Sequence, residues 1–503
     1  MQATILWAAL AAAQAPSAAP AVDVQSTPSP TPAPASTPAP APAPASTPAA
    51  APVTPAPTPA PAPADLQVTA STAPTTVNPQ ITAAAPAPAP ATAAPAPTPS
   101  RFLPPKDAAR MAEAPVDGGK TRWRPGIGIE VSSADKRFSL QFNAFAQLLA
   151  TVRHTGEVPA MGETAAVAAH NDLSLAFRRA RLIFGGNLFA PNIKYKIQLT
   201  ASPIELGWKN GTITRSPILD WYFTFDRLRD ATFQVGQYKV PYNHQRMLRV
   251  TGMQFVDRSA ANNEFTMDRD IGLDIRSKDV AGLGHLRYYA GVYLGDGIAL
   301  YGPGDFGLAY VGRVEVLPFG QYDDLEEADH DRTTKPRMLI GGAFAYIDRD
   351  PHDQHGFGGQ IPADGGKTST LNATADLNFR YAGFSLESGF FWRKATKRIA
   401  GTNVDAMGNP IAPVAPRNGL AYFVQAGYLL PRLPLELGAR WGQIKGQGAP
   451  DQTSLLDQNE LGGVFNYYFA RHWLKLQLDY LHLWNAEIRY GTDQVRLQLQ
   501  AMF

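Results

Sequence analysis

The last eleven residues, Asp493-Gln-Val-Arg-Leu-Gln-Leu-Gln-Ala-Met-Phe503, decide how the rest of the chain is interpreted. Apolar side chains occupy every second position from Val495 to Phe503. The positions between them are polar: Gln494, Arg496, Gln498 and Gln500. Successive side chains of a β-strand point to opposite faces of the sheet. The alternation therefore predicts a strand with one apolar and one polar face.

The terminal phenylalanine favours one class of β-protein. A strand in a soluble sandwich also alternates, but it seldom ends the chain on an exposed aromatic residue. Alternation that runs to a terminal Phe resembles the carboxy-terminal signal of outer-membrane β-barrels. The resemblance implies that Phe503 is an insertion signal recognised by the barrel-assembly machinery. The stretch therefore favours a barrel in the outer membrane over a soluble sheet protein.

The amino-acid composition argues against several other classes of protein. The chain has 503 residues, a net charge of +2 and no cysteine. Without cysteine there is no disulfide framework and no thiolate metal site. The small net charge gives no indication of nucleic-acid binding. No run of about 18 apolar residues occurs, which excludes helical membrane spans. Hydropathy alone would suggest a soluble protein, but barrels escape this test because every second residue of a strand faces water.

The first quarter of the chain differs from the rest in amino-acid composition. Residues 1–15 contain an apolar stretch, Ile5–Leu10, and end in Ala13-Gln-Ala15, which resembles a secretory signal peptide. The alternative is an ordinary Ala-rich tail. Residues 16–122 are rich in Ala, Pro and Thr and nearly uncharged up to about residue 105, so we predict a disordered, extended linker. Its alternative role is a tether or adhesin arm that contacts the cell wall.

From Trp123 onward, short alternating runs replace the linker composition. Leu371, Ala373, Ala375, Leu377 and Phe379, for example, alternate with polar residues. Each run is roughly ten residues, the length of a tilted membrane-crossing strand. The runs lie near 137–153, 178–188, 192–202, 217–227, 231–240, 268–277, 284–295, 307–318, 337–347, 368–381, 384–394, 418–429, 433–443, 459–469, 472–483 and 493–503. We therefore predict, for residues 123–503, an all-β fold: a transmembrane antiparallel barrel of about sixteen strands with an aqueous lumen.

The connections support this prediction because short and long ones alternate. Short joins are expected at Ala190, Leu228, Gly383, Pro431 and Arg471. Long ones are expected around 154–172, 203–216, 241–267, 349–367 and 395–417. Short periplasmic turns and long outer loops are typical of outer-membrane barrels.

One connection breaks the alternation. Phe319–Pro336 is long where a short turn is due, so either a strand is miscounted there or the turn carries an insertion. Its acidic residues are Asp323, Asp324, Glu326, Glu327, Asp329 and Asp331. They lack the spacing and the glycine of a dedicated calcium loop, which favours a solvated acidic turn.

The longest connection is the candidate constriction. Residues 241–267 occupy the position of a third outer loop, and a loop that folds into a barrel narrows it and sets its selectivity. The segment and its exit are basic, with His244, Arg246, Arg249, Arg258 and Arg269. The alternative is a solvated outer loop whose arginines contact lipopolysaccharide.

Strand parity predicts which charges face the lumen. Basic candidates are Arg153, Arg179, Arg181, Lys194, Lys196, Arg276, Arg287, Arg313, Arg380, Arg393, Arg440, Lys475 and Arg496. Acidic candidates are Asp220, Asp226, Asp270, Asp274, Glu315, Asp376, Glu387, Glu436 and Asp479. Arg179 and Arg181 share one strand, and neighbouring guanidinium groups in a confined lumen would bind phosphate or another anion through paired hydrogen bonds. The alternative is that opposite charges pair across the wall.

Several blocks together resemble the phosphate-selective porin O and P family, over roughly residues 123–503. They are Phe177-Arg-Arg-Ala-Arg-Leu-Ile-Phe-Gly-Gly-Asn-Leu-Phe189, Tyr195-Lys-Ile-Gln198, Val235-Gly-Gln-Tyr-Lys-Val-Pro-Tyr242, Asp257-Arg-Ser-Ala-Ala-Asn-Asn-Glu-Phe265, Arg269-Asp-Ile-Gly272, Ala290-Gly-Val-Tyr-Leu-Gly-Asp-Gly297, Asn466-Tyr-Tyr-Phe469 and Lys475-Leu-Gln-Leu-Asp-Tyr-Leu-His482. The resemblance implies a homotrimeric channel of the bacterial outer membrane, in contact with lipid and lipopolysaccharide, that passes small anions such as phosphate by diffusion.

The resemblance and the loop position together define a predicted anion path. Its residues are Arg178, Arg179, Arg181, Lys239, Arg246, Arg249, Arg258 and Arg269. No enzymatic activity, cofactor or metal is expected, and His330, His352 and His355 form no convincing metal set. Trp221, Trp441, Trp473 and Tyr480 are expected in interfacial aromatic girdles rather than in a sugar-binding row.

Two alternatives remain for the function of the barrel. A general or sugar-passing porin would have balanced lumen charge or an inward aromatic row. An outer-membrane lipid hydrolase would need a serine beside His482, which falls on the outward parity of its strand.

Overall fold

The computed structural model describes residues 121–124, 128–157, 168–209, 211–295, 297–298, 307–355, 359–399, 401–449, 451–485 and 490–503. The predicted signal peptide and all but the last two residues of the predicted linker lie outside these described residues. Strand β1 (Thr121–Arg124) spans the boundary that the sequence places at residue 123.

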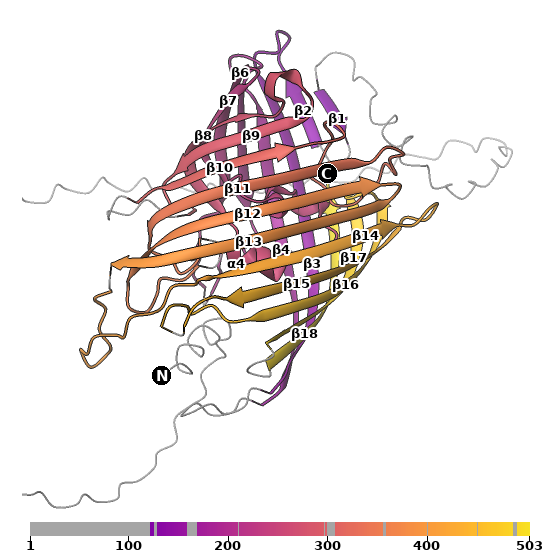
Figure 1. Ribbon diagram of the computed structural model, residues 1–503. Coiled ribbons are helices and arrows are strands. Elements are labelled where there is room, and N and C mark those ends of the chain that lie inside the picture. The colour runs from indigo at the N-terminus through magenta and orange to yellow at the C-terminus, as the bar shows by residue number, and fades with distance from the viewer. Residues whose placement is uncertain are drawn as a thin grey trace, which may run out of the picture. The chain divides into compact units, whose positions relative to one another are not determined.

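The described chain folds into a closed antiparallel barrel of sixteen strands, β3 to β18 (Figure 1). Each strand pairs with its sequence neighbour, and β18 closes the ring on β3 through the register Met502↔Phe145. The strands are β3 (Ser139–Thr155), β4 (His170–Asn187), β5 (Ile193–Thr200), β6 (Ile218–Leu228), β7 (Ala231–Lys239), β8 (Arg269–Ser277), β9 (Leu286–Tyr293), β10 (Ala309–Val316), β11 (Arg337–Asp350), β12 (Lys367–Tyr381), β13 (Phe384–Ile399), β14 (Gly419–Leu429), β15 (Leu435–Gly446), β16 (Gln458–Ala470), β17 (Leu474–Asn485) and β18 (Tyr490–Met502). The predicted fold and strand count are confirmed.

Burial follows the parity expected of a membrane barrel. In β10, Arg313 and Glu315 are buried inside while Val314 and Val316 are exposed outside. The outer face is therefore apolar and the interior is polar, which is the reverse of a soluble protein. Trp221, Trp441 and Tyr480 are also exposed on the outside, where girdle residues belong.

The connections alternate between the two ends of the barrel. The turns that follow β4, β6, β12, β14 and β16 are short, and the connections that follow β5, β7, β11 and β13 are long. In outer-membrane barrels the short turns are periplasmic. The exception is residues 317–336, which we call the strap. Strands β10 and β11 pair directly through Val316↔Ile340, so the strap is an insertion within a hairpin and no strand was miscounted.

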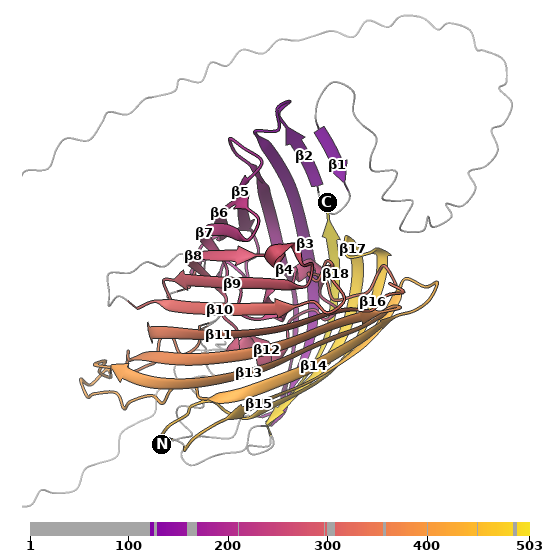
Figure 2. The same ribbon diagram turned by 45° about the horizontal axis from the view of Figure 1, so that its top comes forward.

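Two features of the N-terminal side were not predicted. Strand β4 begins at His170, eight residues before the expected start at 178. Strand β2 (Gly128–Ser132) pairs with Ser139 to Phe142 of β3, just before the point in the chain where Ala144 pairs with Phe503, and β1 pairs with β2 (Figure 2). The two short strands thus cover the free edge that β3 presents beyond the end of β18.

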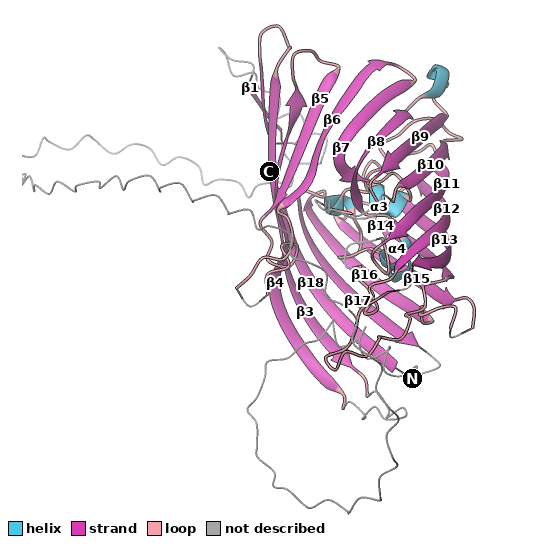
Figure 3. Ribbon diagram, turned by 90° about the vertical axis from the view of Figure 1, so that its left-hand side faces the viewer, coloured by secondary structure: helices cyan, strands magenta, loops and turns pink. Residues whose placement is uncertain are grey.

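Short helices lie inside the ring of strands (Figure 3). They are α3 (His244–Met247), the 3₁₀ turn η1 (Val250–Gly252) and α4 (Ala260–Phe265), all from the connection between β7 and β8. A further 3₁₀ turn, η2 (Val280–Gly282), lies between β8 and β9. No helix in the described ranges is long and apolar enough to span a membrane.

Candidate functional site: a basic constriction

The connection between β7 and β8, residues 240–268, forms the constriction loop. It leaves the barrel wall at Val240-Pro241, where proline has no N–H to continue the strand ladder. Tyr242 follows and is fully buried. Ser259 directly precedes helix α4, and its hydroxyl accepts a hydrogen bond from the Asn262 N–H at 3.1 Å. This N-cap satisfies a helix donor that would otherwise be unpaired inside the barrel.

Inward side chains of the opposite wall hold the loop across the lumen. The Val256 N–H donates to Asp479 at 3.0 Å, and the Ala260 N–H donates to Glu460 at 2.6 Å. Gln477 and Gln500 donate to loop carbonyls at 2.7 and 3.0 Å. Buried backbone groups need hydrogen-bond partners, and the polar inner face of β16 to β18 supplies them for the loop.

The end of α4 is fixed by one carboxylate and one ring. Glu264 accepts hydrogen bonds from Arg393 at 3.1 Å and from Arg417 at 2.9 Å. Phe265 stacks on Phe391 with ring centroids 6.1 Å apart, and the Arg393 guanidinium lies 4.7 Å from the Phe265 ring. These contacts attach the loop to β13 and to the outer connection that follows it.

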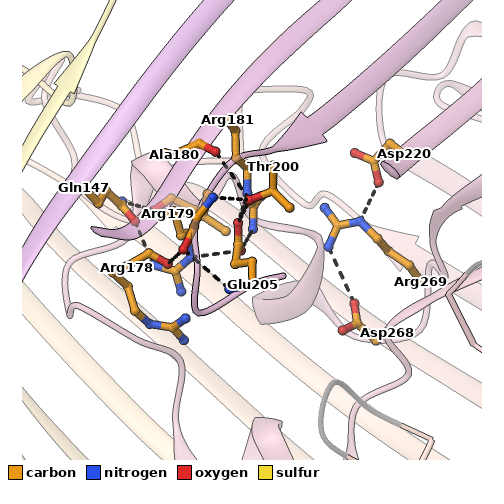
Figure 4. Close-up of polar contacts among 12 residues, drawn as sticks. Gln147, Arg178, Arg179, Ala180, Arg181, Thr200, Glu205, Asp220, Asp268 and Arg269 are labelled. Carbon is orange, nitrogen blue, oxygen red and sulfur yellow. Dashed lines mark hydrogen bonds and ion pairs between the residues drawn. The ribbon is translucent and has the colours of Figure 1, made fainter. Parts of the chain in front are cut away.

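Two neighbouring arginines of β4 both reach the loop. The register between β3 and β4 shifts so that Gln147 faces Arg179 and Leu148 faces Phe177, which leaves Arg178 as the extra residue of a β-bulge. Arg178 and Arg179 therefore both bind Asp257, at 3.0 and 2.7 Å. Arg179 also donates to Gln147 at 2.8 Å (Figure 4). Burial alone would raise the pKa of Asp257, but the surrounding arginines lower it well below its usual range.

Three further arginines lie beside this pair. Arg181 donates to Glu205 from Nε at 3.0 Å, and Glu205 belongs to the outer connection between β5 and β6. Arg269 lies between Asp220, at 2.6 Å, and Asp268, at 3.8 Å (Figure 4). Arg246 on α3 forms an ion pair with the same Asp268.

Lys239 and Arg258 lie beside these arginines and differ from them in their hydrogen-bond partners. Both donate to the carbonyl oxygen of Leu248, at 2.8 and 3.1 Å, and Arg258 also donates to the carbonyls of Gln245 and Arg246. Among the described residues, neither cation has a carboxylate oxygen within 4.0 Å. Backbone carbonyl oxygens, and not a carboxylate in direct contact, therefore hold both side chains in place.

The structure brings together seven of the eight residues of the predicted anion path. Arg178, Arg179, Arg181, Lys239, Arg246, Arg258 and Arg269 surround the same part of the constriction loop, and we call them the basic cluster. Arg249 lies apart from them, against Asp323 at 3.2 Å and Glu326 at 3.5 Å of the strap.

Sequence reasoning missed the carboxylates of this site. Asp257, Glu205 and Asp268 lie in connections, where the period-two pattern of the strands gives no orientation. The one available signal was that Asp257 directly precedes Arg258 in the family-like block. Together with Asp220 they form ion pairs with five of the seven cations, and Lys239 and Arg258 are the two that they do not reach.

Many inward arginines elsewhere in the barrel are paired with carboxylates. Arg313 contacts Glu315 at 2.8 Å and Asp376 at 2.5 Å. Arg440 contacts Glu460 at 2.7 Å, and further pairs join Arg276 to Asp274, Arg287 to Glu315 and Arg496 to Asp479. Pairing across the wall therefore accounts for many of these cations. Among the described residues, Arg380 and Lys475 are inward cations that contact backbone carbonyls and no carboxylate oxygen within 4.0 Å.

The acidic strap is not the solvated turn that the sequence favoured. Asp324, Glu327 and Asp329 are buried, and Asp324 contacts His244 at 3.3 Å and Arg287 at 3.0 Å. Only the outer carboxylates, Asp323 and Asp331, have mostly exposed side chains. The expectation failed because composition indicates charge but does not reveal that the strap folds back into the lumen. No group of three potential metal ligands was found within the described part of the chain.

An inward-folded outer loop in a sixteen-stranded barrel with a polar lumen defines a porin of the bacterial outer membrane. The family model described as phosphate-selective porin O and P matches residues 164–503. The chain therefore belongs to the phosphate-selective porin O and P family.

Solved structures of outer-membrane proteins also resemble the chain. The loop L8 deletion mutant of OmpT from Vibrio cholerae has 9% identity and a TM-score of 0.44, with 72% of this chain and 99% of that chain covered. The channel DcaP of Acinetobacter baumannii has 12% identity and a TM-score of 0.45, with 74% and 99% covered. Salmonella typhi OmpF in complex with daunomycin has 14% identity and a TM-score of 0.42, with 74% and 100% covered. Among curated proteins, none matches the chain.

Proposed function

We propose that this porin passes small anions by passive diffusion, with phosphate and polyphosphate as candidate solutes. The observation that carries the proposal is the pair Lys239 and Arg258, which have no carboxylate oxygen within 4.0 Å among the described residues. An anion that enters the constriction would be attracted by these two cations and by the excess charge of the basic cluster. Guanidinium groups at the same place offer paired hydrogen-bond donors that match phosphate geometry.

A second group of cations supports a continuous path toward the short turns. Lys194 and Lys196 lie on β5, nearer to the short turn that precedes it than Gln198 and Thr200. Their side chains are 53% and 37% exposed, although each has an aspartate partner. An anion that passes the constriction would therefore meet solvated lysines before it reaches the periplasmic mouth.

The variant Lys239→Gln tests this proposal most simply. Removing one uncompensated charge from the constriction should lower the ratio of anion to cation permeability about threefold, measured as the zero-current potential in a salt gradient. Lys239→Arg should retain the preference. Arg229→Gln is the matched control, because it removes a charge from an exposed side chain in the turn between β6 and β7. An unchanged zero-current potential in folded Lys239→Gln would contradict the proposal.

The second candidate is a general or sugar-passing porin. The observation that favours it is the pairing of inward arginines with carboxylates along β9 to β18, as in Arg313 with Asp376, Arg440 with Glu460 and Arg496 with Asp479. Such a channel would give a zero-current potential near zero, and phosphate would not reduce its chloride current.

Further proposals concern partners and organisation. We propose a homotrimer, as the family resemblance implies, with Phe503 as the signal for the barrel-assembly machinery. Phe503 is exposed on the outer face and its backbone pairs with Ala144 at 3.0 Å, so a recognition complex could reach the side chain before the barrel closes. Residues 1–15 and 16–122 remain proposed as signal peptide and linker, and a tether or adhesin role of the linker would be tested by deleting it and measuring cell-wall association.

A further inference from the structure

The strap is the most unusual segment of this barrel. It connects β10 to β11 at the end that carries the short turns, although strands paired this closely can be joined by a few residues. A long insertion at the periplasmic end is therefore not needed to close the hairpin. Its contacts show where the additional residues lie.

The strap enters the lumen along the wall formed by β9 to β14. Arg287 of β9 contacts Asp324 at 3.0 Å, and the Tyr322 hydroxyl donates to Asn378 of β12 at 2.7 Å. Gln425 of β14 donates to Glu327 at 2.9 Å. These partners all lie on inward parity positions, so this half of the strap fills space inside the barrel.

The tip of the strap meets the constriction loop. The Arg249 N–H donates to the Leu325 carbonyl at 3.0 Å, and the Glu327 N–H donates to the Gly252 carbonyl at 2.9 Å. A Cβ atom at Gly252 would lie 3.0 Å from the Cα of Glu326, so glycine lets the two segments approach without displacing the strap. A segment from the outer end and a segment from the periplasmic end therefore touch in the interior.

The far half of the strap is attached to the neighbouring short turns. Asp329 accepts a hydrogen bond from the Gly383 N–H at 2.8 Å, and Arg332 donates to the Ala382 carbonyl at 2.8 Å. Arg471 of the turn between β16 and β17 forms an ion pair with Asp331 at 3.1 Å. The strap therefore extends across the periplasmic rim from β9 to β17.

We infer that the strap is a second constricting element of the channel, inserted from the periplasmic mouth. It closes the lumen along β9 to β17 and leaves the exit beside β4 to β7, where Lys194 and Lys196 are solvated. The constriction loop narrows the outer end of this passage, and the strap forms the side of the passage that faces β4 to β7. The inference requires only that the protein is a channel, and it is independent of which ion the channel prefers.

A single cysteine tests this inference without disturbing the fold. The chain has no cysteine, so Glu326→Cys would carry the only thiol. The Glu326 side chain is 32% exposed, which leaves this position accessible to a small thiol reagent. A charged and a neutral methanethiosulfonate reagent should each reduce single-channel conductance about twofold, because both add bulk to a narrow passage.

Met407→Cys is the matched control, since Met407 is 85% exposed in the outer connection between β13 and β14. Its complete modification should leave conductance unchanged. Complete modification of Glu326→Cys, verified by mass, without a change in conductance would overturn the inference.

Shortening the strap gives an independent test. Replacing residues 320–336 by an Asn-Gly turn retains the pairing of β10 and β11 and removes the inserted segment. We expect conductance to rise about twofold or more, while heat-modifiable mobility shows a folded barrel. A folded, shortened channel with wild-type conductance would refute a constricting role. The zero-current potential, measured in the same membranes, reports separately on the proposed ion preference.

Discussion

Two segments enter this lumen from opposite mouths, and they use charge in different ways. The constriction loop comes from the outer end and contributes to a cluster in which cations outnumber carboxylates. The strap comes from the periplasmic end and carries mainly carboxylates, and Asp324, Glu327 and Asp329 are each used in an anchoring contact. The comparison leads us to expect that uncompensated charge, and not total charge, determines which part of the pore acts on ions.

The difference also assigns separate tasks to the two segments. Charge that is already paired contributes little to the field in the lumen. The constriction loop should therefore govern which ions pass, and the strap should govern how many pass. Variants in the two segments should change different measured quantities, which allows the comparison to be tested.

The largest effect is expected where the constriction loop is attached to the wall. Glu264→Gln leaves the guanidinium groups of Arg393 and Arg417 without their shared carboxylate, and breaking a buried ion pair costs about 3 kcal/mol. We expect the loop end to detach, with noisy, enlarged single-channel currents and a lower unfolding temperature. Asp353→Asn is the control, because Asp353 lies 3.8 Å from Arg417 and is more exposed. Quiet, wild-type currents from Glu264→Gln would show that the loop does not depend on this anchor.

A smaller effect is expected at the attachment of the strap. Arg332→Ala removes hydrogen bonds to the carbonyls of Leu429 and Ala382 and the packing of the guanidinium on Tyr428 at 5.7 Å. The loss of charged hydrogen bonds costs about 1.5–3 kcal/mol, so the strap should undock part of the time. Conductance should rise while the zero-current potential stays constant. Lys335→Ala, an exposed position of the same segment, should change neither, and a shift in ion preference with Arg332→Ala would contradict the division of tasks.

The smallest effect is a pH dependence of the strap. His330 lies against Tyr468 and His472, with ring centroids 4.4 and 4.6 Å away. Desolvation, followed by the nearby cations, lowers the pKa of His330 to about 3, from an ordinary value of about 6.5. Desolvation and Lys475 also lower the pKa of His472. The charged and titratable groups facing the two imidazoles are Arg380, Arg471, Lys475 and Glu326.

The sign of this effect follows from linkage. Because the pKa of docked His330 lies below its free value, the neutral imidazole contributes stability fully above pH about 6.5, and this contribution is lost as the pH falls toward about 3. Conductance should therefore rise on acidification over that range. His330→Phe retains the ring packing without the proton, so it should weaken the rise. Identical profiles of conductance against pH for wild type and His330→Phe would show that protonation of His330 does not cause the rise.

Much of the barrel could be predicted from the sequence, because alternation is a local property. The strand count, the inward parity of residues such as Arg313 and Arg440, and the position of the constriction loop all follow from period two and from connection length. The polar face of the last strand was also visible in Gln498 and Gln500. The hydrogen bond from Gln500 to the Thr251 carbonyl was not visible, since it depends on a loop more than two hundred residues away in the sequence.

The site depended on irregularities that local patterns do not encode. Strict parity would direct Arg178 outward, and only the bulge in β4 allows it to join Arg179 on Asp257. In the sequence, the strap was visible only as a long connection at a place where the alternation of loop lengths predicts a short turn. Its burial requires partners from β9, β12 and β14, and no periodic signal links those strands to an acidic insertion.

The central claim is that uncompensated cations in the constriction give the channel a preference for anions. The zero-current potential of the purified protein in a planar bilayer, under a tenfold KCl gradient, tests it most directly, followed by titration with phosphate. The account predicts a zero-current potential whose sign shows that chloride permeates faster than potassium. It also predicts a chloride current that falls as phosphate occupies the basic cluster. A potential of the opposite sign, or one near zero without phosphate block, would contradict it.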